Sequence, residues 1–533
     1  MEFLLVNKRS LPNMAPDRPL LTAALAFAVL LGLLLMATRP PGLLTADSSQ
    51  SAGELSGNEE EALPPAEGGP DGQTVVDPGA VAGLQEEELS YDGAVSTSVT
   101  YPVLPDAEPL TEYLEERLSA EVAAFDDANP GADTYEADWN LTAARQGLVG
   151  VRTSATENDS EGERERYSTY WYDSDQGQVY ESTHLFDDQE ALAALNTLVR
   201  EEVGDAADTS GMYPISALYD SIGFDPDGDL VVEFDAGQVA PDEQGRVHAV
   251  LDHSEVEPLL SDLGVRAHEA ATVGVDSFEV AGAPETVGDD SVGAPPGTIS
   301  PDDGSVDCAD PETTCVALTY DDGPGGGTPQ LLDTLDEHDA RATFFVTGHP
   351  VQEHPETLRR AYAEGHEIAN HTLEHPDLTS IGAGDATMDL SATQALVLRE
   401  IGYDMDLMRP PYGATDGGVK TVTQDMGLAQ ILWSVDTNDW RHRDADKVAD
   451  TALDGADDGA IILMHDIHST TITASEEIVR ELDSRGVEMV TVSQLLGSTE
   501  PGESYMDGVP DADVGDEENA DGGAEEGSDA SDG

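Results

Sequence analysis

The chain has 533 residues, and its 109 acidic residues against 23 basic ones give a net charge of −86. A field this negative disfavours nucleic acid as a partner. The hydrophobic share of 39% suits globular domains, and recurring apolar runs argue against the alternative of a wholly disordered acidic protein. Because the acidic residues are spread over the whole length, we interpret the composition as a halophilic acidic surface, whose self-repulsion salt would screen.

An uncharged, mostly apolar run of 18 residues lies near the N-terminus, at Leu20–Ala37. This length just spans the hydrocarbon core of a bilayer, so residues 20–38 are predicted to be a transmembrane anchor. Three basic residues within residues 1–19 place that segment in the cytoplasm and all that follows the anchor outside. The prediction is a single-pass protein of the cell membrane with an extracellular catalytic domain. Secretion after cleavage of the run as a signal peptide is the alternative.

Composition divides most of the remaining chain into linkers and folded parts. Residues 39–94 are rich in Ser, Gly, Pro and Glu, which predicts a disordered linker. Residues 95–265 mix strand-like and helix-like runs and are predicted to form a smaller α+β domain. Residues 266–307 are rich in Ala, Gly, Asp and Pro and read as a second linker. Residues 498–533 form an acidic tail that is predicted to be disordered.

About seven strand-like runs alternate with helix-like runs over residues 308–497, which predicts an α/β fold with a parallel barrel. The only two cysteines, Cys308 and Cys315, open this region. In an exported protein they can pair as a disulfide that closes a small loop. Two free thiols are the less favoured alternative, and a metal site made of cysteines would need more such ligands nearby.

Two adjacent carboxylates, Asp321 and Asp322, follow the strand-like run Cys315–Tyr320 and precede a Gly-Pro turn. Such a turn would hold both acids at the open end of a strand, where barrel enzymes place their sites. One carboxylate could bind a metal while the other serves as a base. An ordinary acidic turn is the alternative, and in a chain this acidic it needs no special explanation.

His371 and His375 are four residues apart, and one helical turn would bring both imidazoles onto one face. Such a pair alone is a weak motif, because chance alone yields some in a chain with 13 histidines. Together with one of the two aspartates, the pair completes a His-His-Asp set. Three protein ligands with an open position are typical of a catalytic metal site.

Three further residues follow apolar runs of the predicted barrel. Arg409 precedes two prolines that stiffen the loop, and its guanidinium could hold a carboxylate bidentately. Asp439 comes shortly after the run that ends at Ser434, and His465 ends the run Ile462–Met464. A histidine after an apolar strand is commonly a packed residue, but the end of a barrel strand favours catalysis.

These motifs, in this order and spacing, resemble the NodB-homology polysaccharide deacetylases, carbohydrate esterase family 4. The resemblance covers about residues 315–497, and its motifs are Thr319–Pro324, His371–His375, Arg409–Gly413, Asp436–Trp440 and Ile462–His468. The family implies a distorted (β/α) barrel that holds a divalent metal, usually zinc. The roles it implies are metal ligation by Asp322, His371 and His375, base catalysis by Asp321 and acid catalysis by His465. It further implies orientation of Asp321 by Arg409, tuning of His465 by Asp439, an oxyanion donor at the backbone N–H of Tyr412, and an acetyl pocket at Trp440 and Leu463.

Residues 95–265 resemble the extracellular domain of the anti-sigma factor RsiV. The stretches that carry this resemblance are Tyr170–Asp173, Gly177–Tyr180, Leu185–Asp188, Phe234, Val239–Pro241 and Gly245. The resemblance implies a binding or sensing module in the cell wall, with lysozyme or glycan as its ligand.

Together the two resemblances imply a membrane-anchored, metal-dependent N-deacetylase of cell-wall polysaccharide, with peptidoglycan amino sugars as substrate and acetate as product. A chitin-type or acetylxylan deacetylase is one alternative. A lysozyme-sensing or wall-binding protein whose barrel is secondary is the other.

Overall fold

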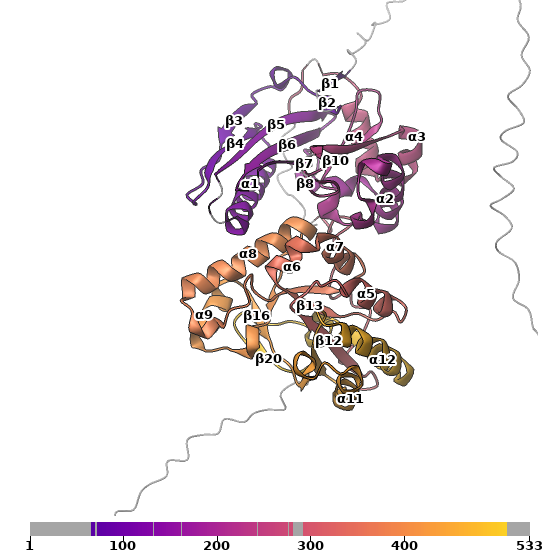
Figure 1. Cartoon of the computed structure of the whole chain (residues 1–533). Helices are drawn as coiled ribbons and strands as arrows, with labels where there is room; N and C mark the ends of the chain where they lie inside the picture. Colours follow the sequence, from indigo (N-terminus) through magenta and orange to yellow (C-terminus); the bar gives the residue numbers. More distant parts are fainter. Residues whose placement is uncertain are drawn as a thin grey trace, which may run out of the picture. The chain divides into compact units, whose positions relative to one another are not determined.

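The computed structural model describes residues 66–69, 72–129, 131, 133–160, 162–241, 244–275, 277–280 and 292–508 (Figure 1). The predicted cytoplasmic segment, the predicted anchor and the tail beyond residue 508 lie outside these ranges. Among the described helices, none has both the length and the apolar character that a membrane span requires. Residues 62–533 belong to one compact unit, which contains every described element.

The N-terminal part of this unit is built on a six-stranded sheet in the order β3-β4-β5-β6-β7-β8. Only the β4–β5 pair is parallel, and helix α1 (Glu108–Ala128) connects these two strands. The strands are β3 (Gln85–Glu88), β4 (Ser96–Val103), β5 (Thr134–Arg145), β6 (Leu148–Asn158), β7 (Glu163–Asp173) and β8 (Gln178–Glu181). One side of α1 is apolar at helical spacing and contributes Leu110, Leu114, Leu118 and Val122 to the core.

A smaller antiparallel sheet follows in the order β11-β10-β9. Its strands are β9 (Ser221–Phe224), β10 (Leu230–Phe234) and β11 (Val247–Leu251). Helices α2 (Gln189–Val203), α3 (His253–Val256) and α4 (Asp262–Ala271) accompany this sheet. Strands and helices are thus mixed within an α+β arrangement.

The structure differs from the predicted linkers and tail at their edges. Strand β2 (Thr74–Val75) pairs with β1 (Glu67–Gly68), and β3 pairs with β4, although all but β4 lie within the predicted linker 39–94. The sparse apolar residues of this stretch, Val76, Val81 and Leu89, are buried. Helix α4 runs into the second predicted linker, and β20 (Ser504–Tyr505) lies in the predicted tail. Polar composition misled the prediction because an edge strand needs few buried side chains.

The C-terminal part is a curled parallel sheet in the order β17-β18-β12-β13-β14-β15-β16-β20, with β19 also paired to β12. The strands are β12 (Cys315–Asp321), β13 (Thr343–Val346), β14 (Glu367–Asn370), β15 (Leu407–Met408), β16 (Ala429–Ile431), β17 (Val435–Asp436), β18 (Ala460–His465) and β19 (Glu488–Val490). The pairing ends at β17 and β20, so the expected distorted barrel is an open, curled half-barrel.

Helices follow most strands of this sheet, as right-handed β/α connections require (Figure 1). They are α5 (Thr328–Asp336), α6 (Gly348–Glu353), α7 (Pro355–Ala363), α8 (Ala383–Ile401), α9 (Gly417–Asp425), α10 (Asp439–His442), α11 (Ala445–Gly455), α12 (Ser469–Arg485) and α13 (Val492–Leu496). Because the strands run in parallel, their carboxyl ends meet at one edge, and the loops there carry the predicted site.

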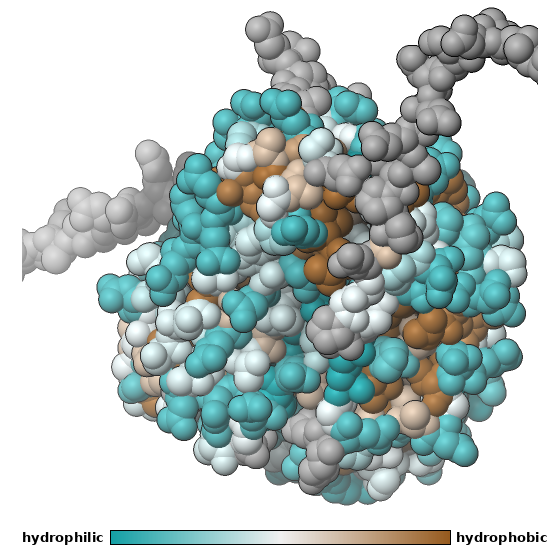
Figure 2. All heavy atoms as spheres, turned by 90° about the horizontal axis from the view of Figure 1, so that it is seen from above, coloured by the Kyte–Doolittle hydropathy of each residue, from teal (hydrophilic) through white to brown (hydrophobic). Residues whose placement is uncertain are grey.

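Helix α8 also contacts the N-terminal sheet through a partly buried ion pair. Arg399 donates from both terminal nitrogens to Glu157 of β6, at 2.8 and 2.7 Å. On the face drawn in Figure 2, hydrophilic residues predominate and hydrophobic ones form smaller patches between them.

Candidate metal centre and active site

Three side chains converge beyond the carboxyl ends of β12 and β14. The Oδ1 atom of Asp322 lies 3.6 Å from Nε2 of His371 and 3.5 Å from Nε2 of His375. One donor atom of each of the three residues lies within 4.8 Å of the others, as a shared metal ion requires. The structure therefore brings together the three residues that the sequence predicted as ligands.

The sequence predicted that a helical turn brings the two imidazoles together, and this prediction was wrong. Residues 371–375 form a non-helical loop after β14, and Thr372 and His375 have positive φ values of 70° and 52°. The rings still approach, with centroids 4.9 Å apart. The prediction of contact was correct, but a left-handed turn and not an α-helix produces it.

The donor set fits a small divalent cation. In a tetrahedral zinc site, ligand bonds of about 2.1 Å place the donor atoms about 3.4 Å apart, close to the separations seen between Asp322 and each histidine. Nδ1 of His371 lies 2.7 Å from the carbonyl oxygen of Arg409, so its N–H is used there and Nε2 is free to bind a metal. Burial lowers the pKa of His371 to about 3, which keeps the ring neutral.

Asp321 lies beside this cluster, and Arg409 holds its carboxylate. Nη1 of Arg409 donates to Oδ1 of Asp321 at 2.7 Å, while Oδ2 lies 3.7 Å from Nε2 of His371. The pair is not the bidentate one that the sequence suggested. The other N–H groups of Arg409 donate to the hydroxyl of Thr319 and to the carbonyls of Ile431 and Leu432, because the buried guanidinium must satisfy its donors.

Arg409 also contacts two aromatic rings: its Cζ lies 4.0 Å from the ring centroid of Phe345 and 5.7 Å from that of Trp433. Burial raises the pKa of Asp321, and Arg409 opposes this rise. Asp321 is thus an oriented carboxylate with one oxygen turned towards the histidine cluster.

His465 ends β18 directly beside Asp321 of β12 in the parallel register. Its Nδ1 lies 2.8 Å from Oδ1 of Asp439, and its backbone N–H donates to Oδ2 of the same carboxylate at 2.8 Å. Thr471 donates to that Oδ2 as well, at 2.6 Å. Burial alone would lower the pKa of His465, but Asp439 and the other nearby carboxylates outweigh it and raise the pKa to about 9. A protonated imidazole therefore lies beside the carboxylate of Asp321 across the strand pair.

The residues predicted to contact substrate occupy different environments. Tyr412 is 71% exposed, and its ring packs edge-on against His375 with centroids 4.7 Å apart. Trp440, on α10, is 52% exposed and follows Asp439 directly, whereas Leu463 is buried within β18 two residues before His465. Ile467 is also exposed beyond β18. Two aromatic rings and an aliphatic side chain are thus exposed on segments that follow or adjoin the site residues.

Cys308 and Cys315 form a disulfide, as the sequence predicted. The bridge lies at the start of β12, at the strand end opposite Asp321. It therefore takes no part in the metal cluster.

Comparison with known proteins adds the family to this geometry. Residues 309–431 match the family described as polysaccharide deacetylase, a range that contains the three predicted ligands, Asp321 and Arg409 but ends before Asp439 and His465. A chitooligosaccharide deacetylase of Sinorhizobium fredii is 37% identical over 186 residues, which are 32% of this chain and 86% of that protein.

The chain belongs to the polysaccharide deacetylase family.

Other members of the polysaccharide deacetylase family are more similar but longer. Peptidoglycan-N-acetylglucosamine deacetylase PgdA of Listeria monocytogenes is 43% identical over 194 residues, 36% of this chain and 41% of that protein. Peptidoglycan-N-acetylmuramic acid deacetylase PdaC of Bacillus subtilis is 41% identical over 187 residues, 35% of this chain and 39% of that protein. The matched region is thus about two-fifths of each relative. The solved structure of PdaC has 40% identity, covers 35% of this chain and 91% of that chain, and has a TM-score of 0.34.

The family match lies in the deacetylase region, at residues 309–431. The relatives from Listeria, Bacillus and Sinorhizobium each match about a third of the chain, and they do not support the resemblance of residues 95–265 to RsiV. The binding or sensing role that this resemblance implied therefore gains no support from these relatives.

Several residues that support this polysaccharide deacetylase site were not predicted from the sequence. Asp389 of α8 accepts the backbone N–H groups of Leu373 and Glu374, and Thr372 accepts the backbone N–H of His375. Asn370 accepts the N–H of Thr372. Asn370 and Thr372 adjoin the histidine pair in the sequence, so their support of the loop could have been predicted. Asp389 lies on helix α8, and nothing in the sequence indicates that it contacts the loop after β14.

Proposed function

We propose that the chain is a metal-dependent N-deacetylase of cell-wall polysaccharide that releases acetate from peptidoglycan amino sugars. The observation that carries this proposal is the convergence of Asp322, His371 and His375, flanked by a held carboxylate and a protonated imidazole. The names of the relatives from Listeria and Bacillus support peptidoglycan as the substrate class.

The chemistry of the site can be derived from the chain's own residues. A divalent cation held by Asp322, His371 and His375, with zinc the best fit to the donor set, would polarise the substrate carbonyl and acidify water. Asp321 takes the proton of the attacking water, and its hydrogen bond to Arg409 fixes the oxygen that does so. The backbone N–H of Tyr412 is proposed to donate to the oxyanion that develops on the carbonyl.

Breakdown of the oxyanion formed by water attack requires a proton for the leaving nitrogen. His465 carries that proton, because its raised pKa keeps the ring protonated at neutral pH. Asp439 holds the ring in one orientation through Nδ1, which leaves Nε2 to donate. The C–N bond breaks, the amine takes the proton, and the products are acetate and a free amino sugar.

The exposed surfaces around the site suit a polysaccharide. Sugar rings pack on aromatic faces, and Tyr412 and Trp440 offer two such faces beside the proposed metal. Leu463 and Trp440 are proposed to line the acetyl group. Chitin and acetylxylan remain the alternative substrates, since they carry acetyl groups on similar chains, and the chitooligosaccharide deacetylase of Sinorhizobium supports the former.

Acetate release from purified peptidoglycan, with and without a chelator, tests the proposal. We expect release that stops with chelator and returns with added zinc, and muropeptide mass spectrometry should show loss of acetyl groups from one of the two amino sugars. Asp322→Ala should abolish release with an unchanged circular dichroism spectrum, whereas Asp425→Ala, an exposed residue at the end of α9, should not. Chelator-resistant release, or none with a folded metal-loaded protein, would refute it. Chitin oligomers and acetylxylan in parallel assays decide the substrate class.

We further propose that the enzyme acts outside the cell, tethered by residues 20–38. The predicted anchor and the preceding basic residues support this placement. Fractionation of cells that produce the full chain should find it in the membrane, with residues 308–497 digested by added protease. A protease-resistant or soluble product would contradict the tether.

The second candidate is a wall-binding or lysozyme-sensing protein. The resemblance of residues 95–265 to RsiV favours it, but such a protein would not need the held base and acid at the metal cluster. Lysozyme binding without acetate release in the experiment above would decide in its favour.

A further inference from the structure

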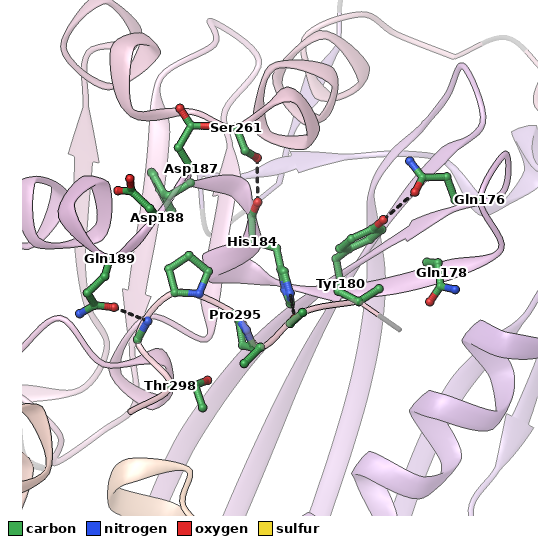
Figure 3. Close-up of a pocket in the computed structure, with 16 residues that line it drawn as sticks. Gln176, Gln178, Tyr180, His184, Asp187, Asp188, Gln189, Ser261, Pro295 and Thr298 are labelled. Atoms are coloured by element: carbon green, nitrogen blue, oxygen red, sulfur yellow. Dashed lines mark hydrogen bonds between the residues drawn. The ribbon is translucent and has the colours of Figure 1, made fainter. Parts of the chain in front are cut away.

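A cavity of about 620 Å³ lies in the N-terminal part of the compact unit, and none of the residues of the candidate active site lines it. Its wall combines β8, the turn before it, the start of α2 and a strap formed by residues 292–298 (Figure 3). The volume is in the range of small-ligand sites. We call it the β8–α2 cavity.

The β8–α2 cavity gathers stretches that the active site leaves unused. Gln178 and Tyr180 belong to Gly177–Tyr180, and Asp187 and Asp188 belong to Leu185–Asp188. Both stretches are among those that carry the resemblance of residues 95–265 to RsiV, and neither contributes to the half-barrel. Residues of both stretches line the same cavity, which packing of the core alone does not require.

The aromatic wall of the cavity is fixed in place. The hydroxyl of Tyr180 donates to Oε1 of Gln176 at 3.0 Å, and its ring stands edge-on to His184 with centroids 5.4 Å apart. In Figure 3 the ring and the two glutamines lie on one side of the hollow, and Asp187 and Asp188 lie on the other. A ring held in this way can serve as a stacking face without losing side-chain freedom when a ligand binds.

The strap is fixed as well, so the cavity is formed before any ligand arrives. Nδ1 of His184 accepts the backbone N–H of Glu181, so Nε2 donates to the carbonyl of Gly293 at 3.0 Å. Oε1 of Gln189 accepts the backbone N–H of Gly297 at 2.6 Å. Two side chains of the N-terminal part thus hold the chain segment that leads to the half-barrel.

Two polar groups of the wall are available to a ligand. Within the described ranges, the side-chain amide of Gln178 and the carboxylate of Asp187 form no hydrogen bond or ion pair, although both line the cavity. Asp188 is occupied, since it caps α2 by accepting the backbone N–H of Ala191 at 2.9 Å. The free groups are therefore an amide and one anion.

The charges of the wall select the ligand class. No lysine or arginine is among the lining residues, and the cap on α2 removes the helix end as an anion site. A phosphate or a uronic acid would thus find no lysine or arginine in the wall, and the carboxylate of Asp187 would repel it. A stacking ring, an amide and a free carboxylate instead suit a hydroxyl-rich ring that bears a cationic amine.

We propose that the β8–α2 cavity binds glycan that carries free amino groups, the product class of the deacetylation inferred above. This proposal rests on the proposed function for the origin of its ligand. Its consequence is retention: glycan that has left the active site keeps the enzyme on the same strand. Asp187 would pair with the amine, Gln178 would bond hydroxyl groups, and Tyr180 would stack on the ring.

Isothermal titration of the full chain tests the cavity, with Asp321→Asn present throughout so that no ligand is turned over. The probes are a tetramer of glucosamine, a tetramer of N-acetylglucosamine and inorganic phosphate. We expect the glucosamine tetramer to bind most tightly. Asp187→Asn and Gln178→Ala should each weaken it at least tenfold, and Asp205→Asn, an exposed acid outside the cavity, should not.

The outcomes separate this proposal from the proposed function. Equal affinity in all variants would overturn the cavity as the binding site, and equal affinity for both tetramers or tight phosphate binding would overturn the ligand class. Cavity variants in the otherwise native chain should keep acetate release from a short acetylated oligomer. If acetate release fails but tetramer binding depends on Asp187, only the proposed function falls. Unchanged thermal melting of each variant confirms that the fold is intact.

Discussion

The carboxylate of Asp389 accepts the backbone N–H of Leu373 at 2.7 Å, and so ties helix α8 to the loop between His371 and His375. The same Oδ1 atom lies 3.3 Å from the backbone nitrogen of Glu374. The left-handed residues interrupt the regular backbone hydrogen bonds of this loop, so the side chains of Asn370, Thr372 and Asp389 supply acceptors that hold its shape.

Asp389→Ala is expected to weaken zinc binding about tenfold or more, as loss of a supporting partner commonly does. Asp389→Asn keeps an oxygen acceptor and should lose much less. Titration of the metal-free protein with zinc measures both. Asp385→Ala, an exposed change in the first turn of α8, is the control. Equal zinc affinity in Asp389→Ala and the native chain would show that the loop holds itself.

Arg409→Lys is expected to reduce deacetylation at least a hundredfold and to lower the free energy of unfolding by about 3 kcal/mol. A lysine cannot reach Asp321 and the carbonyls of Ile431 and Leu432 together, so buried acceptors lose their donors. Urea unfolding and initial rates measure the two effects. Arg441→Lys, on the exposed side of α10, should change neither; a stable, active Arg409→Lys protein would disprove the orienting role.

Asp439→Asn is expected to move the alkaline limb of the activity profile from near pH 9 to lower pH by a unit or more. Removing the carboxylate removes the bond that raises the pKa of His465. The sign for stability follows: protonated His465 stabilises the native chain below its unfolded pKa of about 6.5, and this stabilisation is lost as pH rises through about 9. Rates of deacetylation measured from pH 5 to 10 locate the alkaline limb, with Asp457→Asn as the control variant. An alkaline limb that does not move in Asp439→Asn would show that a group other than His465 produces it.

Reduction of the bond between Cys308 and Cys315 is expected to cost about 2 kcal/mol of stability and to leave deacetylation unchanged at moderate temperature. The bridge closes a short loop, so its entropic contribution is small. It also lies at the far end of β12 from Asp321. Urea unfolding of Cys308→Ser, with and without reductant, tests this; lost activity in folded protein would link the bridge to the site.

The sequence was most informative where chemistry and strand ends coincide. Asp321, Arg409 and His465 each end or follow a buried strand, and parallel strands bring such positions to one edge. Spacing could not reveal how the histidines meet, because the left-handed turn at Thr372 has no local sequence mark. Nor could it reveal Asp389, whose partner is a backbone N–H in another element. The sequence also could not show that the barrel stays open, since β15 and β17 have only two residues each.

Among the described ranges, nine residues other than glycine have positive φ, and five of them, Asp322, Thr372, His375, Tyr412 and Asn438, lie on loops of the candidate site. Each such residue costs of order 1 kcal/mol relative to a relaxed backbone. Glycine at a position such as Thr372 would relieve that strain but would also widen the range of shapes open to the loop. We therefore expect few substitutions to be tolerated at these positions, even where the side chain takes no part in the chemistry. Selecting variants for heat resistance alone is expected to lower the rate of deacetylation.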